Sequence, residues 1–187
     1  MNTLENAPIQ MDRKAIDLFL RLTDLDLSKM MRELNKLLLY GQQQELITVK
    51  EVEQLVPKTL EHNLFDMTQY ILSGKTEQAL RLFEDLITQG EETIKINAIL
   101  LSQIRLFLQT KFLMKIGYQQ ANIAEILKIH PYRVKLAMQE VRKFDEKILR
   151  RLFDDLVEMD YQIKSGKIEK ELSFQLFVLR TGQLLKS

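Results

Sequence analysis

The stretch EETIKINAILLSQIRLFLQTKFLMKI, residues 91–116, decides the fold class of this chain. Its apolar side chains would occupy most sides of a helix: Ile94, Ile96, Ala98, Ile99, Leu100, Leu101, Ile104, Leu106, Phe107, Leu108, Phe112, Leu113 and Ile116. A helix of this kind is central in a bundle or packed on both flanks. The stretch therefore predicts a long central helix that ends at Gly117, with other helices around it.

Further helical patterns lie on both sides of this stretch. Pro131 suits the first turn of a helix, and Asp145 can cap the next one. Thr48, with Glu51 three residues later, forms a capping-box pattern. The 6 glycines and 3 prolines are too few for a sheet-rich protein of this size. We therefore predict an all-α protein, with helices at 12–22, 27–41, 48–56, 61–72, 75–87, 91–116, 121–127, 131–142, 145–164 and 169–185.

The predicted helices form two groups. The first three make a compact unit of about 45 residues, which is small for an independent domain and should lean on another part of the protein. Pro57 ends this unit, and the remaining helices form a bundle from about residue 60 to residue 187. Residues 1–11 are predicted to be a disordered lead-in.

The composition excludes several classes of protein. Hydrophobic residues make up 45% of the 187 residues and charged residues 28%, which is an ordinary globular balance. Lys and Arg number 27 and Asp and Glu 26, so any nucleic-acid contact must come from a local patch. The lack of cysteine excludes disulfides and thiolate metal sites and suits a reducing cytosol. No run approaches the ~18 apolar residues that a membrane span needs, so a soluble, intracellular protein is predicted.

Catalytic signals are missing from the sequence. It holds no phosphate-binding glycine loop, no dinucleotide-binding glycine motif and no HExxH zinc motif. His62 and His130 have no ligand-like neighbours, so a structural or surface role is predicted for both. Asp154 and Asp155 are adjacent and would point to different faces of a helix, as solvated charges do. We therefore predict a protein that is not an enzyme and has no catalytic, cofactor or metal residues.

The most distinctive stretch is ANIAEILKIHPYRVKLAMQEV, residues 121–141. A short helix, a tight turn and a second helix form the outline of a DNA-binding helix-turn-helix. The inner seam would consist of Ala124, Leu127, Ile129, Val134 and Met138. Tyr132, Arg133 and Lys135 would lie near the start of the second helix and could contact DNA. The alternative interpretation is an ordinary helical corner inside a bundle, with solvated polar residues.

A basic cluster follows this corner. Its members are Arg142, Lys143, Lys147, Arg150 and Arg151. Acidic residues are interleaved with them, namely Glu140, Asp145, Glu146, Asp154 and Asp155. Interleaving favours pairs between residues i and i+4 on a wet helix face over a track for phosphates.

Three segments together resemble the delta subunit of the bacterial DNA polymerase III clamp loader. The first is DLSKMMRELNKLLLYG (26–41), followed by ITVKEVEQLV (47–56). The second is HNLFDMTQYILSGKTEQALRLFEDLITQGEE (62–92). The third is ILKIHPYRVKLAMQEVRKF (126–144), after which DLVEMDYQIKSGKIEKELSFQLFVL (155–179) closes the chain as in that family. Their order and spacing make the resemblance, which covers about residues 12–185.

The resemblance implies a division into domains. Residues 12–57 look like the three-helix lid domain of AAA+ proteins, and residues 60–187 look like the helical collar domain through which five loader subunits form a ring. The family's ATPase-like first domain, which grips the sliding clamp, is expected to be missing from this chain. The stretch Asp26-Leu27-Ser28-Lys29 has no counterpart of the nucleotide-sensing arginine found in ATP-hydrolysing relatives, which fits a subunit that does not turn over ATP.

The resemblance also implies a role and partners. The delta subunit helps to load the sliding clamp onto primed DNA during replication, as a non-catalytic part of a DNA-directed DNA polymerase holoenzyme. Expected partners are the motor ATPase subunits, a delta-prime type subunit and primer-template DNA, in the bacterial cytoplasm at the nucleoid-associated replisome. The candidates for the ring-assembly surface are Leu156, Met159, Ile163, Phe174 and Phe177. The alternative function is a helix-turn-helix DNA-binding regulator, which should show a strong basic face, whereas the net charge is +1.

Overall fold

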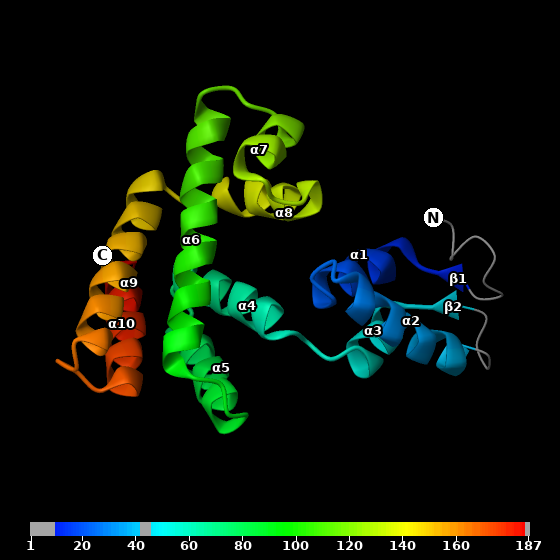
Figure 1. Cartoon of the computed structure of the whole chain (residues 1–187), viewed down its shortest axis with the longest axis horizontal. Helices are drawn as coiled ribbons and strands as arrows, with labels where there is room; N and C mark the ends of the chain where they lie inside the picture. The colour runs from blue at the N-terminus through cyan, green and yellow to red at the C-terminus, as the bar shows by residue number, and fades with distance from the viewer. Residues whose placement is uncertain (1–9, 42–45, 186–187) are drawn as a thin grey trace. The chain divides into compact units, whose positions relative to one another are not determined.

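The computed structural model describes residues 10–41 and 46–185, and these form ten α-helices and one pair of two-residue strands (Figure 1). The prediction of an all-α protein is confirmed, with the small strand pair as an addition. The chain divides into two compact units, residues 1–63 and 64–187. This division lies a few residues later than the predicted one, within helix α4 (Leu60–Leu72).

The first unit contains β1 (Gln10–Met11), α1 (Arg13–Leu22), α2 (Leu27–Gly41), β2 (Leu46–Ile47) and α3 (Val49–Leu55). The two strands are parallel and pair Gln10 with Leu46 and Met11 with Ile47. The lead-in was predicted to be disordered up to residue 11, and this is wrong for its last two residues, because β2 supplies backbone partners for them. The rest of the predicted lead-in, residues 1–9, lies outside the described residues.

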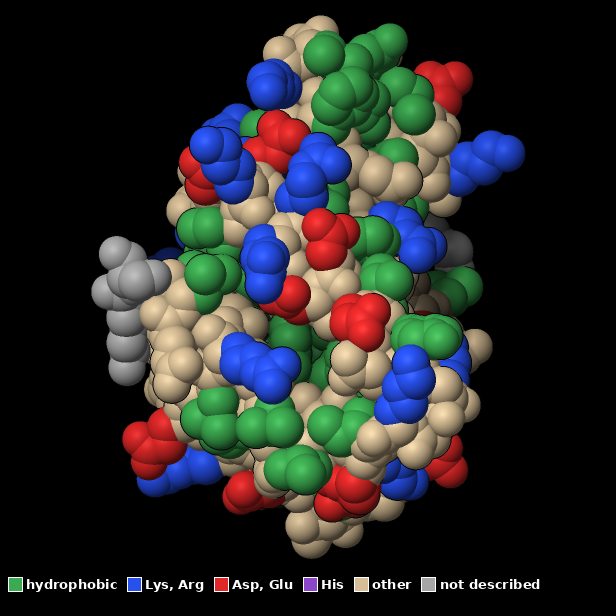
Figure 2. All heavy atoms as spheres, turned by 90° about the vertical axis from the view of Figure 1, so that its left-hand side faces the viewer, with side chains coloured by type: hydrophobic (Ala, Val, Ile, Leu, Met, Phe, Trp, Pro, Cys, Tyr) green, Lys and Arg blue, Asp and Glu red, His purple; other side chains and the backbone are tan. Residues whose placement is uncertain are grey.

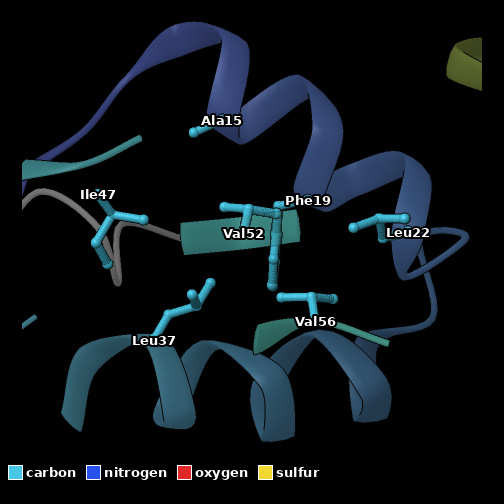
Figure 3. Packing of buried hydrophobic residues seen from close by; sticks show 7 residues of the cluster. All are labelled: Ala15, Phe19, Leu22, Leu37, Ile47, Val52 and Val56. Atoms are coloured by element: carbon cyan, nitrogen blue, oxygen red, sulfur yellow. The ribbon is translucent and has the colours of Figure 1, made fainter. Parts of the chain in front are cut away.

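The core of the first unit is formed by side chains from all three helices and β2. Figure 3 shows them directed toward one another: Ala15, Phe19, Leu22, Leu37, Ile47, Val52 and Val56. The predicted capping box at the start of α3 is confirmed, since the Thr48 backbone N–H donates to Glu51 Oε2 over 2.8 Å and the Lys50 N–H donates to Thr48 Oγ1 over 3.3 Å. Asp26 caps α2 by accepting from the Lys29 N–H over 3.0 Å.

The second unit is a bundle built around α6 (Thr93–Lys115). It further contains most of α4, then α5 (Thr76–Thr88), α7 (Gln120–Leu127), α8 (Pro131–Val141), α9 (Glu146–Lys164) and α10 (Lys170–Leu184). The helices α8, α9 and α10 all pack against α6, which confirms its predicted central place (Figure 1). No helix within residues 10–41 and 46–185 is long and apolar enough to cross a membrane.

The other helices of this unit leave one side of α6 uncovered, so of the two expected arrangements, a central place or packing on both flanks, the first is found. The buried apolar side chains are Ile96, Leu100, Ile104 and Phe107. On the outer side, Phe112 and Ile116 are 55% and 53% exposed. Two further apolar residues of the pattern, Leu101 and Leu108, are half-buried. The neighbouring helices of this unit cover one side of α6 and leave the outer stripe exposed.

Polar contacts fix the neighbours of α6 in register. The Thr68 hydroxyl on α4 donates to Gln103 Oε1 over 2.8 Å, and both side chains are buried. The fully buried Asn97 donates from Nδ2 to Asp160 Oδ1 on α9 over 3.2 Å. Because a buried polar group is costly without a partner, each of these bonds favours one alignment of the helices over its alternatives.

Candidate nucleic-acid interface and assembly surface

The corner between α7 and α8 has the predicted seam. Ile123, Ala124 and Val134 are buried, and Leu127, Ile129 and Met138 pack against them. The same small cluster includes Leu113 and Met114 from the end of α6. The corner is therefore packed onto the bundle, which agrees with the interpretation as an ordinary helical corner. It also keeps the outline of a helix-turn-helix.

The turn of this corner is held by backbone and side-chain bonds. Lys128 has a left-handed backbone with φ 54°, a conformation that glycine adopts more readily. The Ile129 N–H donates to the Ala124 carbonyl over 3.0 Å, which closes the end of α7. His130 Nδ1 accepts from the Tyr132 N–H over 3.2 Å and caps α8, so the predicted structural role of this histidine is confirmed.

The three predicted DNA-contact residues lie together at the start of α8. Arg133 and Lys135 are exposed, and the ring of Tyr132 is half-buried. The Gln120 amide at the start of α7 donates to the Pro131 carbonyl over 2.9 Å and fixes this end of α8 against α7. The start of α8 thus presents two exposed cations beside a partly accessible aromatic ring.

The basic cluster after α8 is partly paired with acids, as predicted. Lys143 pairs with Glu140 at 2.8 Å, Arg150 with Glu146 at 3.1 Å and Arg151 with Asp155 at 3.1 Å. Arg142 and Lys147 are exposed and have no ion-pair partner among the residues that the structure describes. The expected pairs between residues i and i+4 are therefore found for Arg150 and Arg151, and Lys143 pairs over three residues.

The predicted ring-assembly residues do not form a surface. Leu156, Met159, Phe174 and Phe177 are at most 6% exposed, and Ile163 is half-buried. The ring of Phe174 stacks on that of Phe83 on α5, with centroids 4.2 Å apart. The prediction that these residues lie on the surface is therefore wrong for Leu156, Met159, Phe174 and Phe177. Their apolar pattern marks the inward faces of α9 and α10.

The outward faces of α9 and α10 carry other apolar side chains. Val157 and Tyr161, four residues apart on α9, are 45% and 56% exposed. On α10 the exposed apolar residues are Leu172, Leu179 and Leu184. Figure 2 shows the side of the bundle on which α9 and α10 lie, with apolar side chains scattered among charged ones. We name these five residues the α9–α10 face. Val157 and Tyr161 are four residues apart, and Leu172 and Leu179 are seven apart, which was the sequence signal that could have found these four. Leu184 follows Leu179 by five residues and does not share this spacing.

No group of three or more His, Asp or Glu side chains that could hold a metal ion is found within residues 10–41 and 46–185. The same residues contain a packed helical corner with exposed cations and exposed apolar side chains on two neighbouring helices.

Comparison with known proteins places the fold in a class. Residues 61–181 match the family described as "DNA polymerase III delta subunit, C-terminal domain". The "DNA polymerase III subunit delta" of Bacillus subtilis (strain 168) is 44% identical over 160 residues, which are 86% of this chain and 45% of that protein. The "Probable DNA polymerase III subunit delta" of Aquifex aeolicus (strain VF5) is 28% identical over 95 residues, 50% of this chain and 27% of that protein.

A solved structure agrees with these matches. The Bacillus subtilis DNA clamp loader delta protein superposes with a TM-score of 0.83 at 38% identity, over 96% of this chain and 53% of that one. The fold is thus that of the helical C-terminal region of a DNA polymerase III subunit. The chain belongs to the delta subunit family, and it spans about half the length of the relatives from Bacillus subtilis.

Proposed function

We propose that this chain serves in DNA replication as the ring-forming part of a clamp-loader delta subunit. In this proposal residues 12–57 act as the lid domain and residues 60–187 as the collar domain. The observation that carries it is the match of residues 61–181 to the C-terminal domain of the delta family, together with a fold that this family's solved relative shares. The chain would not catalyse a reaction itself.

The α9–α10 face supports a role in assembly. Apolar side chains that stay half exposed on two neighbouring helices, among charged residues, are typical of surfaces that contact another protein. The partners would be the motor ATPase subunits and a delta-prime type subunit, in the cytoplasm of a bacterium. The bundle would be the fixed point of the loader while its ATPase subunits rearrange and the sliding clamp is held open for primed DNA.

Reconstitution tests this proposal. The full chain is mixed with the other loader subunits, and sedimentation measures whether it enters the complex. The double substitution Val157→Glu and Tyr161→Glu should abolish entry, because it places charges within an apolar contact. The control pair Phe112→Glu and Ile116→Glu alters equally exposed apolar residues on α6 and should leave entry intact. A wild-type chain that stays outside the complex would refute the proposal.

We also propose that primer-template DNA is contacted within the assembled loader by the start of α8, through Tyr132, Arg133 and Lys135. The exposure of the two cations supports this contact. A free-standing helix-turn-helix regulator is less well supported, because such a protein relies on a strongly basic face and this chain has a net charge of +1.

A further inference from the structure

A groove with a volume of about 690 Å³ lies in the second unit, where the end of α6 meets the end of α8 and the start of α9. Five basic side chains line it: Lys111, Lys115, Arg142, Lys147 and Arg150. Asp145 and Glu146 are its two acidic lining residues. The groove therefore has a net charge of +3, whereas the whole chain has +1, so positive charge is concentrated here.

The five cations differ in what they contact. Lys111 is half-buried and donates to two backbone carbonyl oxygens, which leaves the third N–H of its ammonium group available to a ligand. Lys115 and Arg150 both approach Glu146, at 3.4 and 3.1 Å. Arg142 comes just before the α8–α9 turn and Lys147 just after it. Both are exposed and have no ion-pair partner in the described part of the chain.

The positive charge continues along α8. Lys135 and Arg142 are seven residues apart and both exposed, so they share one face of the helix, about 10 Å apart along its axis. Gln139, which is also exposed, lies on the same face between them. A chain of phosphates that leaves the groove at Arg142 would meet a second cation at Lys135.

We propose that this groove binds the phosphodiester backbone of a single-stranded nucleic acid. A flexible strand can enter a concave groove, whereas the phosphates of a duplex lie on a stiff, convex cylinder. Aromatic side chains are missing among the described lining residues, so the phosphates supply the binding and little base preference is expected. The proposal deepens the function proposed above, since it adds a phosphate-binding groove to the nucleic-acid contact at the start of α8, with Lys135 between the two.

Fluorescence anisotropy of the full chain with a labelled oligothymidylate, over a series of salt concentrations, tests the groove. The double substitution Arg142→Gln and Lys147→Gln removes two phosphate contacts. It should reduce the slope of log K against log salt by about 1.4 and weaken binding about 25-fold at 0.1 M salt. Thermal melting should be unchanged, because both side chains are exposed.

Two comparison variants make the test specific. Lys75→Gln with Lys170→Gln changes the charge equally at exposed positions outside the groove and should leave affinity within about twofold. Glu146→Gln removes the acid that Lys115 and Arg150 contact, so it should tighten binding and steepen the salt slope by about 0.7. Equal losses in the two double variants would refute the groove as the binding site.

The commitment to a single strand is tested by competition. Polyglutamate that displaces the oligothymidylate as well as unlabelled oligothymidylate does would point to an acidic protein partner and overturn the proposal. A duplex of equal length that binds more tightly than the single strand would do the same. Sedimentation with the loader subunits separates this proposal from the proposed role in assembly. The Arg142→Gln and Lys147→Gln variant should still enter the complex. A wild-type chain that binds oligothymidylate but does not enter the complex would support the groove proposal and refute the assembly proposal.

Discussion

The ammonium group of Lys111 on α6 donates to the backbone carbonyl oxygens of Val141, at 2.7 Å, and Phe144, at 2.5 Å. Val141 is the last residue of α8, and Phe144 lies in the turn that leads to α9. The last carbonyls of a helix lack partners within the helix and carry partial negative charge, which a cation offsets. One side chain of the central helix thus caps α8 and fixes the α8–α9 turn.

The substitution Lys111→Met should destabilise the fold. It keeps the apolar stem but leaves two carbonyls without this donor, so a loss of about 1–3 kcal/mol in the free energy of unfolding is expected. Chemical denaturation measures this loss. Lys115→Met, at an exposed position one turn later, should change stability by no more than about 0.5 kcal/mol. Equal effects of the two substitutions would contradict the capping role.

The two neighbouring leucines of α6 should differ in their importance. Leu100 is 1% exposed and Leu101 is half-buried, although their side chains are identical. Leu100→Ala should therefore cost about 2–5 kcal/mol, and Leu101→Ala clearly less. Denaturation midpoints that shift equally would mean that the buried side of α6 has been assigned to the wrong residues.

Gly182 on α10 should tolerate no side chain while Thr76 is present. A Cβ atom at Gly182 would lie 2.1 Å from Thr76 Oγ1 on α5, so Gly182→Ala should destabilise by about 1–3 kcal/mol. In a Thr76→Ala background the same substitution should be neutral or favourable, since alanine forms helices better than glycine by about 1 kcal/mol. A double-mutant cycle measures this coupling, and additive effects would rule out the close approach.

Carboxylates at helix starts should make stability depend on acid. Bonds from the backbone N–H groups of Leu172 and Glu171 lower the pKa of Glu169, which caps α10. The bond from the Thr48 hydroxyl likewise lowers the pKa of Glu51. Because the folded pKa values lie below the unfolded value of about 4.3, this stabilisation is complete above that pH and is lost as the pH falls through the folded values.

Thermal melts should therefore give a constant midpoint from about pH 7 to about pH 5 and a falling one below about pH 4.3. Glu169→Gln removes one of the titrating groups and should make the acid decline shallower. Superimposable profiles for the wild type and this variant would show that the cap of α10 does not contribute to the pH dependence.

Tyr132→Ala tests the DNA contact at the start of α8. If the half-buried ring stacks on a base, its loss should weaken primer-template binding by the assembled loader roughly 5- to 150-fold and leave ring assembly intact. Tyr132→Phe keeps the ring and should retain the affinity. Unchanged DNA affinity with Tyr132→Ala, or loss of folding, would instead assign the ring to the core of the corner.

Local features were predictable because their causes are close in the sequence. The Thr48 and Glu51 capping box spans one turn, and the ion pair between Arg151 and Asp155 spans another. The length and central place of α6 also followed from its apolar pattern. For such features the sequence holds all the interacting partners within a few residues.

Features that depend on distant partners were not predictable in the same way. Hydropathy cannot separate Leu100 from Leu101, because the neighbours that bury one of them come from other helices. The same limit led the assembly prediction to Phe174, whose partner Phe83 lies on α5, and away from the exposed Leu179. The pairing of Gln10 with Leu46 joins segments far apart in the chain and leaves no pattern in either.

The bond from Asn97 to Asp160 has a consequence for distances within the second unit. Sliding α9 by one turn, about 5.4 Å, would break it and leave a buried amide without this partner. Lys147 and Tyr161 lie on the same helix, about 21 Å apart along its axis. Because α9 is held in register on α6, it fixes the distance between these two residues. A strand in the groove and a protein on the α9–α10 face would be held at a spacing that neither can change, so movement of one bound partner would carry the other with it.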